Sequence, residues 1–338
     1  MTAPRQLKFE HDVPAPGAEE LKDNEILLNI KRIGICGSEI HSYHGLHPSC
    51  IYPVVQGHEY SGIVTAVGKG VKGFKPGDHA TARPQLVCGK CAPCRQGLYN
   101  ICENLKVQAF HADGAAQDYF VVTEDRAVLL PPDMPLDYGA MIEPVAVGAH
   151  ATSRPRSLDG KNVVVSGAGT IGNLIAQFAM ARGAAKVLIT DVSDLRLQKA
   201  RECGIKYTVN VAKTPLKDAV EDIFGDEGYQ VGFEVSGVES SIQSLMATIE
   251  KGSDIVIVAV FAHNPVINME HLGEHELNLI GTLMYRHEDY LKAVEEVSSG
   301  NIKLEPLVTD RFDFMDYDKA YDFIDGHKES SMKVMIEL

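Results

Sequence analysis

Four cysteines stand close together in one short stretch, at a spacing that suits a metal ion. Cys88, Cys91, Cys94 and Cys102 follow the pattern C-x2-C-x2-C-x7-C. Thiolates are soft ligands, and four of them around Zn²⁺ make a closed tetrahedral site. Such a site has no open position for a substrate, so we expect it to be structural. An iron–sulfur cluster also takes four cysteines, and a pair of disulfides is the remaining alternative.

Other candidate metal ligands are spread over the first 143 residues. Cys36, the pair His58 and Glu59, and later Glu143 offer a thiol, an imidazole and two carboxylates. A catalytic zinc site uses about three such ligands and keeps one position open for water or substrate. Taken singly, these residues could equally be a packed thiol, a core histidine and a surface turn. Spacing alone does not bring such distant residues together.

Three further histidines follow Cys36 at three-residue intervals, namely His41, His44 and His47. They could form a rival metal site. The alternative, which we favour, is that they line a pocket or face solvent.

A glycine motif in the middle of the chain is typical of dinucleotide binding. The run Gly167-Ala168-Gly169-Thr170-Ile171-Gly172 follows a β-branched stretch and opens a helical pattern. The glycines allow a tight turn, a close approach of the backbone to a pyrophosphate and close helix–strand packing. Asp191 comes about 19 residues after Gly172, where a carboxylate can accept hydrogen bonds from ribose hydroxyls and repel a 2′-phosphate. We therefore expect NAD; a helix-capping role for Asp191 is the alternative.

The elements that must position these residues change in character along the chain. Short apolar runs broken by Gly and Pro, such as 25–30, 60–67 and 119–122, predict an irregular β-rich domain in the first third. From 161 to about 281, strands alternate with helical patterns, which predicts a parallel sheet with helices on both faces. After about residue 290 the pattern changes again, so we expect the chain to return to the first domain.

Composition limits the possible partners. The chain has 338 residues and a formal net charge of −14, so we expect two domains and no nucleic-acid partner. The sequence has no apolar run of membrane-spanning length and no signal peptide. Seven cysteines, an odd number, argue against a disulfide framework. We expect a cytoplasmic protein with no membrane partner.

Taken together, the motifs resemble the medium-chain zinc dehydrogenases over nearly the whole chain. The blocks that carry the resemblance, in the family's order, are Cys36-Gly-Ser38, Gly57-His58-Glu59, Lys75-Pro-Gly-Asp78, the four-cysteine stretch, Glu143-Pro144 and the glycine motif. The resemblance implies an α/β fold with a β-rich GroES-like catalytic domain (1–147 and 288–338) and a Rossmann domain (148–287). It also implies two zinc ions per chain and a homodimer or homotetramer. The family usually begins with one more strand, so we expect a shortened start.

The subgroup looks like the polyol dehydrogenases, which surround the catalytic zinc with Cys, His and Glu. The implied reaction transfers a hydride from a secondary alcohol of a small polyol to NAD and leaves a ketone. Ser38 would take the hydroxyl proton, His41 would pass it towards solvent, and Glu59 would bind the zinc or lie behind it. Tyr43 and Tyr285 would contact the substrate, or else pack in the core. Cofactor contacts are implied for Gly167, Gly169, Thr170, Ile171, Gly172, Asp191 and Arg196.

The substrate is the least determined feature. The stretch around Met284 differs from sorbitol dehydrogenases, which have an arginine there, and looks closer to butanediol dehydrogenases. Butanediol, threonine and sugar-alcohol phosphates are alternative substrates, although the Cys36–His58 segment has no basic cluster for a phosphate. A non-catalytic protein that binds NAD or zinc is the alternative from another class.

Overall fold

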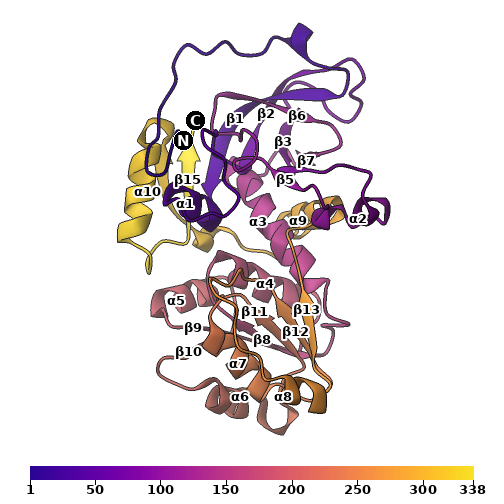
Figure 1. The fold of residues 1–338 in the computed structure, drawn as a ribbon, viewed down its shortest axis with the longest axis vertical. Helices are drawn as coiled ribbons and strands as arrows, with labels where there is room; N and C mark the ends of the chain where they lie inside the picture. The colour runs from indigo at the N-terminus through magenta and orange to yellow at the C-terminus, as the bar shows by residue number, and fades with distance from the viewer. The chain divides into compact units, whose positions relative to one another are not determined.

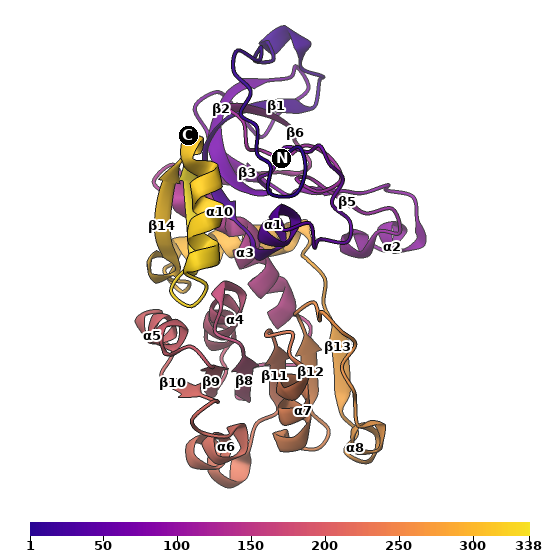
Figure 2. The ribbon, with the colours of Figure 1, turned by 60° about the vertical axis from the view of Figure 1, so that its left-hand side comes forward.

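The computed structural model describes all residues, 1–338. The chain divides into two compact units, the first made of 1–143, 286–298 and 308–338, and the second of 144–285 and 299–307. Helix α3 (Leu136–Thr152) runs from the first unit into the second. Figures 1 and 2 show the two units and their elements. No helix combines the length and the apolar character needed to cross a membrane.

The first unit is built on a mixed sheet of seven strands in which β1 (Glu25–Ile35) is central. This strand pairs with β2, β6 and β15. Even-numbered residues of β1 (26, 28 and 30) face the core in its first half, and odd-numbered residues (33 and 35) face it in its second half. The change occurs because a register irregularity between Ile30 and Arg32 reverses the face to which each side chain points. The other strands of the sheet are β2 (Glu59–Val67), β3 (His79–Ala82), β6 (Tyr119–Thr123), β7 (Ala127–Leu130), β14 (Val308–Asp313) and β15 (Lys333–Glu337).

Short helices and a small hairpin complete this unit. Strands β4 (Gln85–Leu86) and β5 (Lys106–Val107) form a separate two-stranded sheet. Helix α1 (Gly37–Tyr43) begins directly after β1, so that its first turn lies at the end of the central strand. The remaining elements are η1 (Ala18–Glu20), α2 (Ala92–Arg95), η2 (Tyr99–Ile101), α9 (His287–Ser298), η5 (Phe314–Asp316) and α10 (Tyr317–Gly326).

The second unit is a doubly wound parallel sheet with the strand order β10-β9-β8-β11-β12-β13. This order corresponds to the arrangement of dinucleotide-binding sheets, in which the first strand lies in the middle and the chain winds outward to both sides. The strands are β8 (Asn162–Ser166), β9 (Lys186–Asp191), β10 (Tyr207–Asn210), β11 (Val231–Glu234), β12 (Asp254–Ile257) and β13 (Asn278–Gly281).

Helices cover both faces of this sheet, as its strands require. Val163 and Val165 of β8 pack with α4 (Thr170–Ala181) and α5 (Asp194–Glu202) in one core. Val164, between them in sequence, packs on the opposite face with α6 (Leu216–Phe224) and α7 (Glu239–Thr248). Strands that are buried on both faces read as continuous apolar runs. The unit also contains η3 (Gly225–Glu227), α8 (Met269–Glu274) and η4 (Glu305–Leu307).

The end of the chain divides differently from our expectation. We placed 288–338 wholly in the catalytic domain, but residues 299–307 group with the second unit. The backbone of Lys303 explains this, because its N–H donates to Gln177 Oε1 and its carbonyl accepts from Gln177 Nε2. Two hydrogen bonds to a side chain of α4 thus attach the segment 299–307 to the second unit.

Candidate metal and coenzyme sites

The four-cysteine stretch forms one cluster in the lobe between β4 and β5. The sulfur atoms of Cys88, Cys91, Cys94 and Cys102 all lie within 4.8 Å of one another. All seven cysteines of the chain are free thiols in the structure, so the disulfide alternative is wrong. Four converging soft ligands are the donor set that Zn²⁺ prefers in structural sites.

The electrostatics of this cluster also favour a cation. Hydrogen bonds from the backbone N–H groups of Lys90 and Cys91 lower the pKa of Cys88 to about 6. Burial and the neighbouring thiols raise the pKa of Cys94 to about 12. One thiolate therefore opposes the ionisation of the next, and a divalent cation among them would stabilise all four thiolates.

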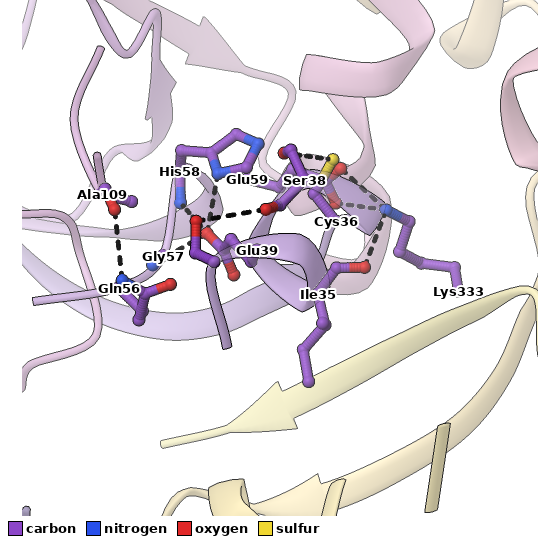
Figure 3. A network of polar contacts seen from close by, with 11 residues as sticks. Ile35, Cys36, Ser38, Glu39, Gln56, Gly57, His58, Glu59, Ala109 and Lys333 are labelled. Carbon is purple, nitrogen blue, oxygen red and sulfur yellow. Dashed lines mark hydrogen bonds and ion pairs between the residues drawn. The ribbon is translucent and has the colours of Figure 1, made fainter. Parts of the chain in front are cut away.

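A second set of converging ligand atoms lies where β1 meets α1. Cys36, His58 and Glu59 each place one such atom within 4.8 Å of the others (Figure 3). Cys36 is the N-cap of α1, and His58 directly precedes β2, of which Glu59 is the first residue. Because β2 pairs with β1 so that Glu59 lies opposite Gly34, the fold brings together residues that are far apart in sequence.

A buried carboxylate that sequence reasoning left without a role orients His58. Glu39, in the first turn of α1, has no exposed surface. Its Oε1 atom accepts hydrogen bonds from His58 Nδ1 at 2.7 Å and from the backbone N–H groups of Gly57 and His58 (Figure 3). A metal-binding histidine commonly donates its second ring N–H to a carboxylate, and here Nε2 stays available for a metal. The one signal in the sequence for this role of Glu39 was its position three residues after the candidate ligand Cys36.

The charges around His58 suit a metal site as well. Burial lowers the pKa of His58, but the carboxylate of Glu39 and the thiol of Cys36 together raise it well above its usual value. A negative field that attracts a proton also attracts a metal cation. The residues present therefore fit a zinc ion bound by sulfur, nitrogen and oxygen.

A buried lysine, which the sequence did not reveal, stands beside the same ligands. Lys333 Nζ donates to Glu59 Oε1 at 2.7 Å, to Oε2 at 2.6 Å and to the carbonyl of Ile35 (Figure 3). Burial lowers the pKa of Lys333, but Glu59, Cys36 and Glu143 outweigh it, so the pKa lies above its usual value. The residue comes from the last strand, about 300 positions away from Cys36, and no local motif marks it.

Of the other residues predicted for this site, one lies at the converging ligands and two lie away from them. Ser38 Oγ donates to Cys36 Sγ at 3.2 Å, so its hydroxyl lies at the candidate metal site. Glu143 is buried in α3 and contributes to the charge around Lys333, but its carboxylate does not belong to the converging set. His41 is exposed on α1, one turn after Ser38.

Both tyrosines for which we expected a substrate contact or a place in the core are buried. Tyr43 is buried in the core, where its ring stacks on Tyr321 at 4.4 Å and Arg5 lies over it. Stacking fixes this ring in the interior, which favours the alternative of core packing for Tyr43, and its substrate contact stays a prediction. Tyr285 has no accessible surface, and nothing in the structure supports a substrate contact for it.

The three histidines after Cys36 do not share a metal site. His44 lies between Asp325 and Arg5, which contact its two ring nitrogens at 2.9 and 2.6 Å. His47 instead stacks on Phe110 at 4.4 Å between ring centroids. The rival metal site at His41, His44 and His47 is therefore wrong.

The glycine motif forms the turn that a pyrophosphate requires. Gly167 has a φ of 113°, which favours glycine. A Cβ atom on Gly172 would lie 1.8 Å from the carbonyl oxygen of Gly167, whereas one on Gly169 would meet nothing within 4 Å. Gly169 is also the N-cap of α4 and has no side-chain cap, so the first N–H groups of this twelve-residue helix can bind an anion.

Asp191 lies at the carboxyl end of β9, beside the glycine motif. Its Oδ2 atom accepts from the backbone N–H of Ala168 at 2.7 Å, and its Oδ1 atom accepts from Ser193 at 2.9 Å. Arg196 Nη1 is 3.8 Å from Oδ2. Each carboxylate oxygen can accept a further hydrogen bond, so Asp191 can hold the loop and still accept from ribose hydroxyls.

Comparisons with known proteins agree with these sites. Residues 22–132 match the alcohol dehydrogenase GroES-like domain, and residues 170–299 match the zinc-binding dehydrogenase domain. The chain is 36% identical to 2-dehydro-3-deoxy-L-galactonate 5-dehydrogenase of Pseudoalteromonas atlantica, over 93% of this chain and 91% of that protein. It is 30% identical to sorbitol dehydrogenase of Bacillus subtilis, over 98% of this chain and 94% of the other.

Solved structures show the same architecture. Galactitol-1-phosphate dehydrogenase from Escherichia coli superposes with a TM-score of 0.87 at 28% identity, covering 97% of this chain and 96% of that one. The chain thus belongs to the medium-chain zinc-dependent alcohol dehydrogenases, and is an oxidoreductase that acts on CH–OH groups.

Proposed function

We propose that this enzyme oxidises one secondary alcohol group of a small polyhydroxylated substrate to a ketone. The observation that carries the proposal is the convergence of Cys36, His58 and Glu59 within 4.8 Å, with the hydroxyl of Ser38 at the same place. Two of the relatives above act, by their names, on sugar-derived compounds, which supports a substrate with several hydroxyl groups.

The side chains of the first unit would hold the catalytic zinc. Cys36 and His58 supply sulfur and nitrogen, and Glu59 or Glu143 supplies oxygen. When bound, zinc acts as a Lewis acid that lowers the pKa of an alcohol hydroxyl, and NAD accepts the hydride. Glu39 holds the His58 ring through Nδ1, which would leave Nε2 to bind the metal, and Lys333 neutralises the charge of Glu59.

Helix α1 provides a path for the proton. Ser38 accepts the proton of the substrate hydroxyl at Oγ, at the half-buried end of the path. His41, one helical turn further on and exposed, is suited to release it, because an unperturbed imidazole titrates near pH 6.5. When bound, the coenzyme would supply the link between the two groups, as the family resemblance implies.

The second unit would bind the coenzyme. The N–H groups at the start of α4, in Thr170 and Ile171, would bind the pyrophosphate, and the glycine motif would give it room. Asp191 accepts from the adenosine ribose, and its charge disfavours a 2′-phosphate. Arg196 lies beside Asp191 and borders the same position.

The cellular context is also a proposal. All seven cysteines are free, which supports a reducing compartment such as the cytoplasm. We further propose a homodimer or a homotetramer, in line with the family resemblance. Light scattering of the purified protein would decide the number of subunits.

The test combines metal analysis with a substrate screen. We expect about two zinc ions per chain and chelator-sensitive NAD reduction on polyhydroxylated secondary alcohols. Butanediol and threonine serve as the alternative substrates in the same screen. A protein with about one zinc per chain and no NAD reduction on any alcohol would favour the non-catalytic alternative.

A further inference from the structure

Two histidines outside the zinc site lie close to Phe110 in the first unit, one stacked on its ring and one next to it in the sequence. His47 stacks on Phe110 with 4.4 Å between ring centroids and an interplanar angle of 5°. His111 is the next residue after Phe110. Ile51 N–H donates to the Phe110 carbonyl at 2.9 Å, which ties the segment of His47 to the segment of His111.

The backbone fixes which nitrogen of each ring carries the proton. His47 Nδ1 accepts from the backbone N–H of Ser49 at 3.2 Å. His111 Nδ1 accepts from the backbone N–H of Val107 at 3.1 Å. A neutral imidazole that accepts at Nδ1 carries its proton on Nε2. Both rings are half-buried, and each therefore offers an N–H donor at Nε2.

This pair of donors adjoins the candidate zinc site. The ring of His58 packs on the same Phe110, with 5.1 Å between centroids. Burial lowers the pKa of His47, and the charges of His111, His41 and His58 lower it further. The imidazoles thus lie close enough to act on one another, so their N–H donors gather near the metal ligand His58.

A chain of net charge −14 repels anions in general, so an anionic substrate needs donors of this kind where it binds. A neutral polyol presents hydroxyls that both donate and accept, whereas a carboxylate only accepts. Two N–H donors match the two oxygens of a carboxylate, and hydrogen bonds to an ionised group are the stronger ones. A phosphate dianion is usually met by arginine or lysine, whereas the donors offered here are two imidazoles.

We infer that His47 and His111 bind a carboxylate of the substrate, so that the enzyme acts on a polyhydroxy acid in preference to a neutral polyol. This inference rests on the function proposed above and names the substrate class of that site. The carboxylate would lie against the Phe110 ring, with the alcohol to be oxidised at the zinc ligands.

The experiment compares substrates that differ in one group. Matched sets of an alditol, its aldonic acid and its terminal phosphate, for several sugar configurations, are assayed for kcat/KM with NAD. We expect the acid to exceed the alditol by about 10-fold or more, the gain typical of a charge-assisted hydrogen bond. If the alditol or the phosphate is preferred, the inference is overturned while the proposed function stands. If no member of any set reduces NAD, the proposed function itself fails.

Variants test the two histidines directly. His47→Leu and His111→Leu should each lower the acid-to-alditol ratio of kcat/KM by about 10-fold, mainly through KM for the acid. The Gln variants, which keep an N–H donor at a similar reach, should recover part of the ratio. His11, which is exposed, provides the matched control His11→Leu. A ratio that stays unchanged in both Leu variants, with zinc content retained, overturns the inference.

Discussion

Lys333 Nζ lies 2.7 and 2.6 Å from the two carboxylate oxygens of Glu59, and both side chains are almost completely buried. The pair joins the last strand of the chain to the strand that begins at the candidate zinc site. A buried charge is costly unless it is paired. The two residues therefore depend on each other, and each limits what the other can do at the metal.

Removing the lysine should destabilise the metal-free protein. Lys333→Met leaves the Glu59 carboxylate buried without its partner, and such a change typically lowers the free energy of unfolding by about 3–5 kcal/mol. The loss should be smaller with zinc present, because the cation then compensates the charge. The chain has no tryptophan, so urea unfolding followed by far-UV circular dichroism, with and without EDTA, is the suitable measurement.

A double variant provides the control for this pair. Combining Lys333→Met with Glu59→Gln removes both charges, and we expect it to be more stable than Lys333→Met alone. If the free energy of unfolding of Lys333→Met in EDTA is less than about 1 kcal/mol below that of the wild type, the ion pair does not stabilise the first unit as argued.

Losing one thiol of the four-cysteine lobe should remove one zinc ion and leave the other. For Cys94→Ser we expect the zinc content to fall from about two ions per chain to about one, together with a lower Tm. Cys203→Ser is the matched control, because Cys203 lies in the second unit and outside the cluster. Unchanged zinc content in Cys94→Ser would contradict a four-thiolate site.

The thiol of Cys203 should resist modification in the folded protein. Burial raises its pKa to about 12, so at pH 8 about one molecule in 10,000 carries the reactive thiolate. Iodoacetamide treatment followed by peptide mass spectrometry should find Cys203 unmodified and find it labelled after denaturation. Rapid labelling in the native state would show that the side chain is accessible.

Coenzyme choice should respond to Asp191. Asp191→Ser removes the charge that disfavours a 2′-phosphate, and we expect the NAD-to-NADP ratio of kcat/KM to fall by about tenfold or more. Asp194→Ser, a nearby exposed aspartate that pairs with Lys213, is the control. An unchanged ratio in Asp191→Ser would remove the role given to this residue.

Much of the second unit could be predicted because its signals are local. The β-branched run around Val164 and the glycine motif predicted a strand, a turn and a helix, and β8 and α4 occupy those positions. One local pattern is misleading. The pair Thr214-Pro215 is typical of a cap followed by proline in the first helical position, but Pro215 is itself the N-cap of α6. Its carbonyl accepts from Ala219 N–H while its own ψ of 146° remains extended.

The first unit was less predictable because its site depends on contacts between distant residues. The sequence named Cys36, His58 and Glu59, since their types and the family resemblance marked them. It could not show that Glu39 binds His58, or that Lys333 reaches Glu59, because pairing of strands distant in sequence creates both contacts. The sequence could not show the burial of Tyr43 for a similar reason, since the residue that stacks on its ring lies on α10.

Removing the hydroxyl of Ser38 should slow the chemical step more than substrate binding. In the structure this hydroxyl donates to the thiol sulfur of Cys36, which places it at the metal ligands, where the substrate proton must leave. Ser38→Ala removes the proton acceptor, and positioned proton transfer typically contributes about 10²–10⁴-fold to the rate. We expect kcat to fall within that range and zinc content to stay unchanged, while Ser38→Thr, which keeps a hydroxyl, recovers part of the rate. Stopped-flow measurement of NADH formation separates this step from product release. If Ser38→Ala forms NADH at the wild-type rate in the first turnover, the proton leaves by another path.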